Sequence, residues 1–392
     1  MKKAFFYCVL IVLPFLIMEV VFRLLPVSNP PYLLPVSAEH PVVHYQPNIE
    51  YLSSGGWNFA IRTRMRTNNF GYNNLWDYHP EDTTPLLMVI GDSFVEALTV
   101  DSGKSAAEIL NSTVSGRGRV YSIGVSGAAL SQYLAFAEFS KNTFRPSAMA
   151  FFIIDNDFDE SLLKYKAEPR FHYFKENGHG FEMQRVDYHR SAIKTFLRKS
   201  AFLRYVMINL RAEYIVENLR RPRCRSEDPY ACAAGSTAAL EQRIADSQRA
   251  VDYFLDQVPV KSGLGKDAVI FVLDPMRPAM YSPEELRKAE SGSIFRMRQY
   301  FKTQASARGY QVVDLQPAFI HRHRLDGSRF EFPTDNHWNE TANRLVAEEI
   351  QKSAVFGRIF RAETHARSVH ARNDIAGRST TGTKPSEHRD RE

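Results

Sequence analysis

The sequence is poor in cysteine and lacks several patterns that would assign it to common classes of protein. It has three cysteines in 392 residues, and the pair near the middle of the chain lacks the further cysteine or histidine that a zinc site needs. The formal net charge is +6. Much of this charge lies in the arginine-rich stretch 220–225 and the C-terminal tail, without interleaved aromatics, which gives little support to nucleic-acid binding. No internal repeat is evident, but hydrophobic residues make up 44% of the chain, enough to build a core.

The N-terminus predicts a membrane anchor over residues 1–26. Lys2 and Lys3 precede an apolar run over residues 4–25, which is roughly long enough to cross a bilayer. Because no cleavage site of small residues follows the run, we expect a retained single helix, with a signal peptide as the alternative. The lysines place the N-terminus in the cytoplasm. The rest of the chain is then extracytoplasmic, in the bacterial periplasm or at the cell surface.

The cysteines agree with an oxidising compartment. One lies in the apolar run, which leaves Cys224 and Cys232 as an isolated pair. A disulfide that closes this short loop is the prediction. Two free thiols in an exposed loop are the alternative.

Residues 85–353 predict one α/β domain. Five short apolar runs alternate with amphipathic segments, which is typical of a parallel sheet covered by helices on both faces. Residues 27–84 contain prolines and aromatics without a long period, and we interpret them as an extended stem. The tail over residues 354–392 is predicted to be disordered because the stretch from residue 361 onward has almost no large apolar side chains.

An insertion of different character interrupts the alternation over residues 158–235. Its first part alternates around Asn177 and Gly178, which predicts a hairpin. Its second part, residues 191–219, predicts one long amphipathic helix. We expect the apolar stripe of that helix to pack on the sheet domain, with the membrane surface as the alternative.

Chemically useful residues follow the predicted strands. Ser93 ends the run LLMVIGDS, Gly127 follows the second run, and Asn156 follows the third. Asp335 and His337 lie in the last loop, just before a predicted helix. Because the carboxyl ends of parallel strands share one edge, these residues are expected to meet there. Each one alone could simply form a turn or a helix cap.

Together these residue types meet the needs of a serine hydrolase. A serine hydroxyl needs an imidazole to take its proton, and the imidazole needs a carboxylate to orient it. Ser93, His337 and Asp335 can fill these roles. The backbone N–H groups of Ser93 and Gly127 and the side-chain amide of Asn156 are the candidates for binding the oxyanion.

The ordered blocks resemble the SGNH hydrolases, also called GDSL esterases, over about residues 47–353. The matching residues are Gly91-Asp92-Ser93, Gly127, Asn156-Asp157, and Asp335 with His337. The resemblance implies a three-layer, flavodoxin-like α/β/α sandwich with a central parallel sheet, and a serine esterase.

The chain departs from the family pattern in two places. Ile154 stands where many members have glycine, so the approach of that loop to substrate is open. The last block is Asp-x-His where Asp-x-x-His is commoner. This spacing is also similar to that of extracytoplasmic members, including alginate O-acetyltransferase-like proteins.

The resemblance and the compartment imply hydrolysis of an O-acyl ester, with O-acetyl as one candidate, on a cell-envelope or extracellular glycan. No cofactor and no metal is expected. One alternative is an O-acyltransferase that uses the same triad with a membrane partner from the envelope polysaccharide machinery. Another is a non-catalytic glycan-binding or assembly module.

Two further stretches are weaker candidates. The segment HRHRLDG, residues 321–327, alternates histidine and arginine. Guanidinium groups repel a metal cation, so a solvated or anion-facing loop is predicted there. Asp274 and Arg277 follow the fourth apolar run, where a structural turn is the prediction and a substrate contact is the alternative.

Overall fold

A five-stranded parallel sheet forms the centre of the molecule. Residues 2–189, 191–212 and 229–361 are described in the computed structural model of the chain. The strand order is β11-β10-β7-β5-β6, and all neighbouring strands are parallel. The five apolar runs of the sequence each form one strand, which confirms the predicted α/β fold. The strands are β5 (Leu86–Gly91), β6 (Arg119–Gly124), β7 (Ala148–Ile153), β10 (Val269–Leu273) and β11 (Gln311–Asp314).

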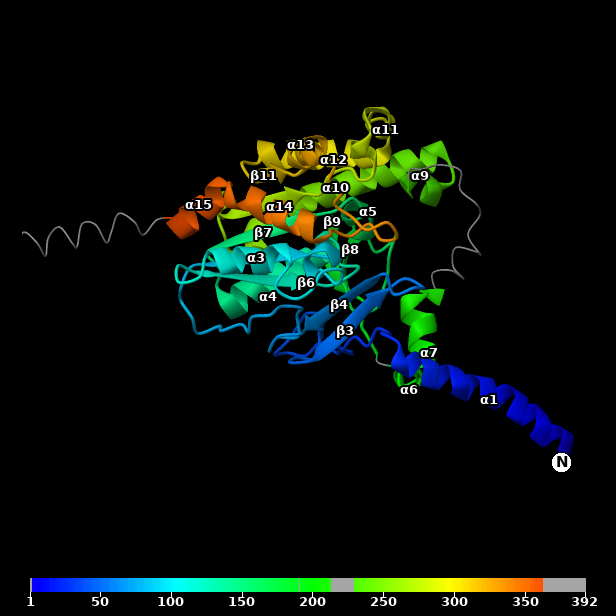
Figure 1. Cartoon of the computed structure of the whole chain (residues 1–392). Helices are drawn as coiled ribbons and strands as arrows, with labels where there is room; N and C mark the ends of the chain where they lie inside the picture. Colours follow the sequence, from blue (N-terminus) through cyan, green and yellow to red (C-terminus); the bar gives the residue numbers. More distant parts are fainter. Residues whose placement is uncertain (1, 190, 213–228, 362–392) are drawn as a thin grey trace, which may run out of the picture.

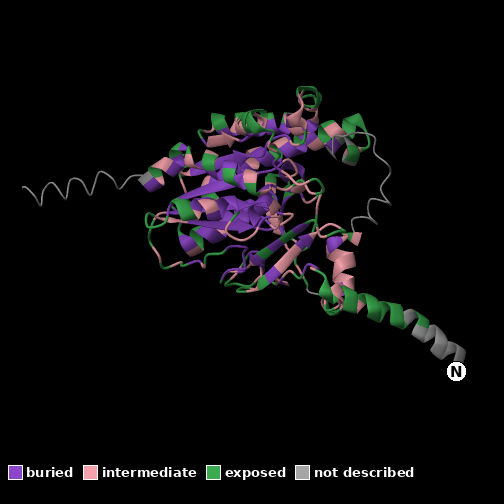
Figure 2. Cartoon of the chain, in the orientation of Figure 1, coloured by how far each residue is buried: buried purple, intermediate pink, exposed green. Residues whose placement is uncertain are grey.

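Helices cover both faces of this sheet, which makes three layers (Figure 1). Alternate residues of a strand point to opposite faces, so in β5 the side chains of Leu86 and Met88 join one apolar cluster and those of Leu87 and Val89 join the other. The central strands are buried throughout (Figure 2). Each fully buried Leu or Val contributes roughly 1.5–3 kcal/mol of hydrophobic free energy.

The helices divide between the two faces. One face is covered by α4 (Leu130–Phe144), α10 (Thr237–Ser262) and α12 (Ser293–Ala307). The other is covered by α2 (Ser93–Glu96), α3 (Ala106–Thr113), α13 (Gln316–Asp326), α14 (Glu340–Gln351) and α15 (Ala354–Arg361). Shorter elements connect them: α5 (Asp157–Glu160), α9 (Pro229–Ala234), η2 (Lys266–Ala268), η3 (Ala279–Tyr281) and α11 (Pro283–Ala289).

The first helix, α1 (Lys2–Leu24), projects away from the domain (Figure 1). Among the described residues, no helix combines the length and the apolar character that a membrane span requires. The anchor predicted over residues 1–26 therefore stays a prediction.

Residues 27–84, predicted as a stem, form two hairpins that pack on the sheet domain. Their strands are β1 (Leu33–Leu34), β2 (His44–Tyr45), β3 (Glu50–Gly55) and β4 (Ile61–Arg66). Tyr78 is fully buried, and its hydroxyl donates to the carbonyl of Ser122 in β6 at 2.6 Å. The segment is thus tied to the central sheet by side chains as well as by the chain itself.

The insertion begins with the predicted hairpin and then departs from the prediction. β8 (His172–Asn177) and β9 (Gly180–Arg185) pair around the Asn-Gly turn, as expected. The single long helix is wrong, because the described part is broken into α6 (Ala192–Leu197), α7 (Ala201–Arg204) and the π-helix η1 (Tyr205–Asn209). Ser200 caps a new helix start by accepting from the N–H of Leu203. The Glu19 carboxylate accepts from the N–H groups of Ala201 and Phe202.

Two other expectations need correction. Disorder does not begin at residue 354, because 354–361 form α15, in which Phe356 and Phe360 are buried against the second apolar cluster. The rest of the predicted tail, 362–392, lies outside the described residues. The segment 321–327 is the end of α13 rather than a loop, and Gly327, at φ 73°, terminates that helix in the left-handed conformation.

Candidate active site

Ser93 is the first residue of α2, immediately beyond the carboxyl end of β5. The turn needs glycine at position 91, because a Cβ there would lie 2.5 Å from Cγ2 of Val95. Asp92 then starts the helix, since its side chain accepts from the N–H of Phe94 at 2.9 Å. The strand-to-helix turn therefore presents the Ser93 hydroxyl at the edge of the sheet.

The structure brings Ser93, His337 and Asp335 together. The Nε2 atom of His337 lies 2.8 Å from Oγ of Ser93, and its Nδ1 atom lies 2.5 Å from Oδ1 of Asp335. Both distances are within hydrogen-bond reach. The His337 side chain is 23% exposed, so solvent reaches the histidine.

The short Asp-x-His spacing is compatible with this contact. Oδ1 of Asp335 accepts from the backbone N–H of His337 at 2.9 Å and also faces its ring Nδ1. One carboxylate oxygen thus fixes both the backbone and the ring of the histidine. Burial raises the pKa of Asp335, but the hydrogen bonds and charge of His337 outweigh burial and hold the pKa below its usual value.

The loop that carries the histidine is tied to the end of β10. Asp274 accepts from Nε1 of Trp338 at 2.7 Å and from Nη2 of Arg277 at 2.8 Å. Nη1 of Arg277 donates to the carbonyl of Asn336 at 2.7 Å. Asp274 and Arg277, predicted to form a turn or contact substrate, therefore hold the residues on both sides of His337.

Gly127 and Asn156 lie beyond the two strands that flank β5. Gly127 follows β6 with a φ of 87°, and Asn156 follows β7. Within the described residues, the backbone N–H groups of Ser93 and Gly127 are not used in another hydrogen bond. Asn156 Nδ2 donates to Oε2 of Glu160 at 3.0 Å, which leaves its second N–H for another acceptor.

Glu96 links the serine turn to the glycine loop. It is buried, and its Oε2 accepts from the backbone N–H of Ser126 at 2.7 Å and from the Ser126 hydroxyl. Burial raises the pKa of Glu96, although these hydrogen bonds oppose the shift. Sequence reasoning missed this residue, and its only signal was a charged side chain in the first turn after a predicted nucleophile.

Buried carboxyl groups gather at this edge of the sheet. Burial raises the pKa of Asp92 to about 6, against the opposing effect of the hydrogen bond from Phe94. Burial also raises the pKa of Asp157 well above its usual value, and its carboxyl accepts from the N–H of Ile154 and the hydroxyl of Tyr133. In the Asn-Asp block, the aspartate therefore holds the loop.

The other predicted features lie away from Ser93 or outside the described residues. Cys232 is disulfide-bonded, and Cys224, its predicted partner, lies outside the described residues. Among the described residues, no group of three or more His, Cys, Asp or Glu side chains is arranged to hold a metal ion. His323 Nδ1, in the HRHRLDG segment, lies 2.9 Å from the carbonyl of Ser328.

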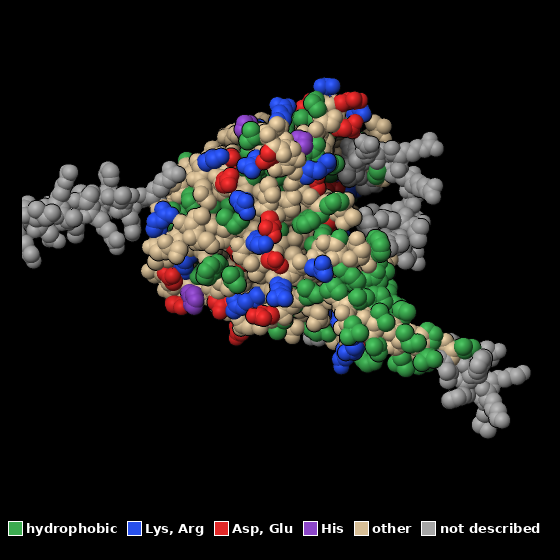
Figure 3. Space-filling model, viewed as in Figure 1, with side chains coloured by type: hydrophobic (Ala, Val, Ile, Leu, Met, Phe, Trp, Pro, Cys, Tyr) green, Lys and Arg blue, Asp and Glu red, His purple; other side chains and the backbone are tan. Residues whose placement is uncertain are grey.

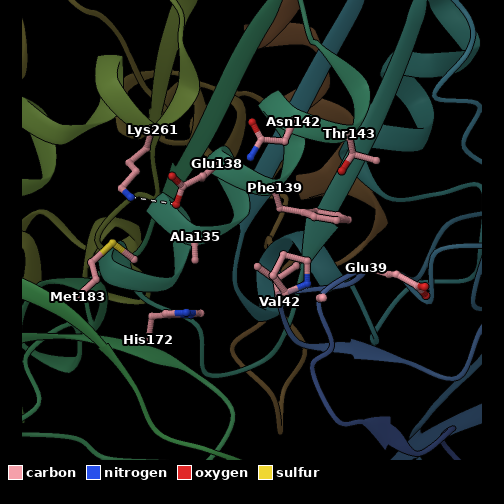
Figure 4. Close-up of a pocket in the computed structure, with 12 residues that line it drawn as sticks. Glu39, Val42, Ala135, Glu138, Phe139, Asn142, Thr143, His172, Met183 and Lys261 are labelled. Atoms are coloured by element: carbon pink, nitrogen blue, oxygen red, sulfur yellow. Dashed lines mark hydrogen bonds and ion pairs between the residues drawn. The ribbon is translucent and has the colours of Figure 1, made fainter.

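A cavity of about 550 Å³ lies beside α4 (Figure 4). Phe139 of α4, His172 of β8 and Lys261 of α10 contribute to its lining, and Lys261 pairs with Glu138, another lining residue, at 2.9 Å. No predicted site residue lines this cavity. It is therefore separate from the serine site.

Among known proteins, the chain is similar to solved structures. No protein-family model and no curated protein matches the chain. A lipolytic protein of the G-D-S-L family from Veillonella parvula is 12% identical over 69% of this chain and 98% of that chain, with a TM-score of 0.35. The acetyl xylan esterase AlAXEase is 11% identical over 69% of this chain and 99% of that chain, with a TM-score of 0.37.

A catalytic mutant of Axe2, an acetylxylan esterase from Geobacillus stearothermophilus, gives similar values. It is 11% identical over 70% of this chain and 95% of that chain, with a TM-score of 0.37. The matching structures thus include G-D-S-L lipolytic proteins and acetylxylan esterases.

Proposed function

We propose that the chain is a serine esterase of the SGNH type. The observation that carries this proposal is the continuous contact from Ser93 Oγ to His337 Nε2, at 2.8 Å, and from His337 Nδ1 to Asp335, at 2.5 Å. A serine, an imidazole and a carboxylate in this order form the constellation that activates a hydroxyl as a nucleophile. A structural hydrogen bond to Ser93 would not require the third group.

The chemistry follows from this order of contacts. His337 Nε2 takes the proton of the Ser93 hydroxyl while Ser93 Oγ attacks the ester carbonyl carbon. Asp335 keeps the Nδ1 proton in place and stabilises the imidazolium. The imidazolium then gives its proton to the departing alkoxide, and the alcohol leaves. The same imidazole then takes a proton from water, whose oxygen attacks the acyl carbon. The bond to Ser93 Oγ breaks, the imidazolium returns the proton to that oxygen, and the acid leaves.

The oxyanion of the tetrahedral intermediate needs hydrogen-bond donors that are already in position. The N–H groups of Ser93 and Gly127 and the free N–H of Asn156 are assigned to this role. Each such donor contributes roughly 10²- to 10³-fold to the rate in other acyl-transfer enzymes.

We assign the substrate to the O-acyl, particularly O-acetyl, esters of an envelope or extracellular glycan. The partial exposure of His337 leaves the site open to an ester carried on a larger molecule. The acyl group then passes to water. Transfer to a sugar hydroxyl is the competing outcome, and an assay of acetate release separates the two.

We further propose that the protein sits at a lipid surface. Hydrophobic side chains gather along the coloured part of α1 and the adjoining part of the domain (Figure 3). In α6, Ile193 and Phe196 are 72% and 69% exposed, and Trp57 is 73% exposed. Tyr205 connects α1 with Trp57, because its ring lies 4.3 Å from that of Phe22 in α1 and its hydroxyl donates to the carbonyl of Trp57. Exposed apolar helices and tryptophans at one end of a domain favour the membrane interface.

Ester hydrolysis by the full chain tests the function. Purified protein in detergent is assayed on a small acetyl ester and on an acetylated glycan, with Ser93→Ala beside it. Ser112→Ala, an exposed serine of α3, is the matched control. We expect Ser93→Ala to lose at least about 10³-fold in kcat and Ser112→Ala to retain wild-type activity.

Two outcomes contradict the proposal. Hydrolysis that survives in Ser93→Ala excludes Ser93 as the nucleophile. A wild-type enzyme that releases no acetate, but acetylates an added glycan with dependence on Ser93, is a transferase.

A further inference from the structure

A bridge of side chains joins the two loops that flank the serine. Asn156 Nδ2 donates to Oε2 of Glu160 at 3.0 Å, and Nζ of Lys166 lies 2.5 Å from the same oxygen. Nζ of Lys166 also donates to the carbonyl of Gly127 at 3.0 Å. Because β5 lies between β6 and β7 in the sheet, this bridge runs between the loops on either side of Ser93.

The side chains of the bridge are partly buried, which restrains their positions. The Lys166 side chain is 15% exposed and that of Glu160 is 32% exposed. Partly buried, charge-assisted hydrogen bonds are stronger and shorter than neutral ones. Lys166 therefore exchanges much of its hydration for two fixed acceptors, one in each loop.

The glycine loop is held from both sides. Glu96 accepts from the N–H of Ser126, and Lys166 donates to the carbonyl of Gly127. The peptide N–H of Gly127 lies between these two fixed points. Its direction is thus set by two side chains, one from the turn after Ser93 and one from the insertion.

We propose that Lys166 and Glu160 are positioning residues for the oxyanion-binding groups, Lys166 through the carbonyl of Gly127 and Glu160 through the carboxamide of Asn156. The inference rests on the proposed esterase function. It gives the start of the insertion a part in catalysis, since Lys166 belongs to the segment that interrupts the α/β alternation. Lys166 acts through the backbone, so its effect is on the geometry of the donors.

The test is steady-state kinetics of full-length Lys166→Met on a small acetyl ester. Methionine keeps an unbranched stem but removes the charge and the donors. Because a misplaced donor loses much of its effect on the transition state, we expect kcat to fall about 10- to 100-fold with KM changed less than about 2-fold. Lys166→Arg keeps a cation that reaches both acceptors and should recover most of kcat.

Lys164→Met is the matched control. Lys164 lies two residues away and pairs with Glu176 and Asp246 instead. Lys164→Met should leave kcat within about 2-fold of wild type. Thermal unfolding of the three variants is measured beside the kinetics.

The results separate the inference from the function on which it rests. If wild type is active and Ser93→Ala is not, but Lys166→Met matches Lys164→Met in kcat, the positioning role is wrong and the esterase stands. A fall in kcat/KM carried by KM, or a failure of Lys166→Arg to recover activity, also overturns it. No hydrolysis by wild type overturns both.

Discussion

Replacing Arg277 with methionine perturbs the loop that carries His337. The side chains of Arg277 and Asp274 are 4% and 5% exposed, so the substitution leaves a buried carboxylate with Trp338 as its remaining side-chain donor. Removing one partner of a buried ion pair costs roughly 3–5 kcal/mol of folding free energy. We therefore expect a clear loss in the free energy of unfolding, measured in urea.

The same substitution should lower the rate of ester hydrolysis. It removes the hydrogen bond to the carbonyl of Asn336, which precedes His337. A displacement of about 1 Å in a catalytic group can cost about 10²-fold in rate. We expect kcat to fall about 10- to 100-fold at a temperature where the variant is folded, with little change in KM.

A control separates stability from positioning. Arg119→Met also removes several hydrogen bonds to backbone carbonyls, those of His79, Asp82 and Thr84, but at the amino end of β6, far from the site edge. It should lower stability and leave kcat unchanged. The double variant Asp274→Asn/Arg277→Met removes the unpaired charge and should regain stability without regaining kcat. If Arg277→Met and Arg119→Met show the same kcat, the tether to the loop has no catalytic role.

Three other predictions follow from the same structure. Asp335→Asn keeps an acceptor for His337 but removes the charge, so kcat should fall about 10³- to 10⁴-fold in steady-state assays, and a loss below about 10-fold contradicts the role of Asp335. The pKa of Asp92 is about 6 when folded and 3.8 when unfolded, so its ionisation makes wild-type stability fall as pH rises from about 4 to 6. Asp92→Asn should remove this loss, which is on the order of 3 kcal/mol in the free energy of unfolding at pH 8. Urea unfolding at about pH 4 and at pH 8 measures it, and a pH dependence equal to that of wild type refutes the prediction. In vesicles of brominated lipid, full-chain tryptophan emission should be quenched, and Trp57→Phe, but not Trp76→Phe, should abolish the quenching. Quenching that persists in Trp57→Phe, or none in wild type, contradicts the proposed lipid contact.

The sequence was sufficient to predict the elements whose signals are local. Each buried strand of the central sheet is a short apolar run, and the runs end at small or polar residues such as Gly91 and Asp155. The hairpin of β8 and β9 has its signal in Asn177 and Gly178. The convergence of Ser93 with the last loop followed from one topological rule, that parallel strands share their carboxyl edge.

The rest depended on contacts between distant parts of the chain. The long helix predicted over residues 191–219 is broken at Ser200, which caps α7, and Glu19, some 180 residues earlier, accepts from the N–H groups of Ala201 and Phe202. The bridge from Glu160 through Lys166 joins two loops by side chains that lie in no motif. The sequence indicates Asp274 as a turn residue or a substrate contact, but its partner Trp338 lies 64 residues further along the chain.

The central claim is that Ser93 is an activated nucleophile, and covalent labelling tests it most directly. Full-length protein is incubated with a fluorophosphonate, digested and analysed by mass spectrometry. The contact between Ser93 and His337 predicts one label, on Ser93, in wild type and a labelling rate reduced at least about 10²-fold in His337→Ala. Labelling at another residue, or equal labelling of Ser93 in His337→Ala, would contradict the account.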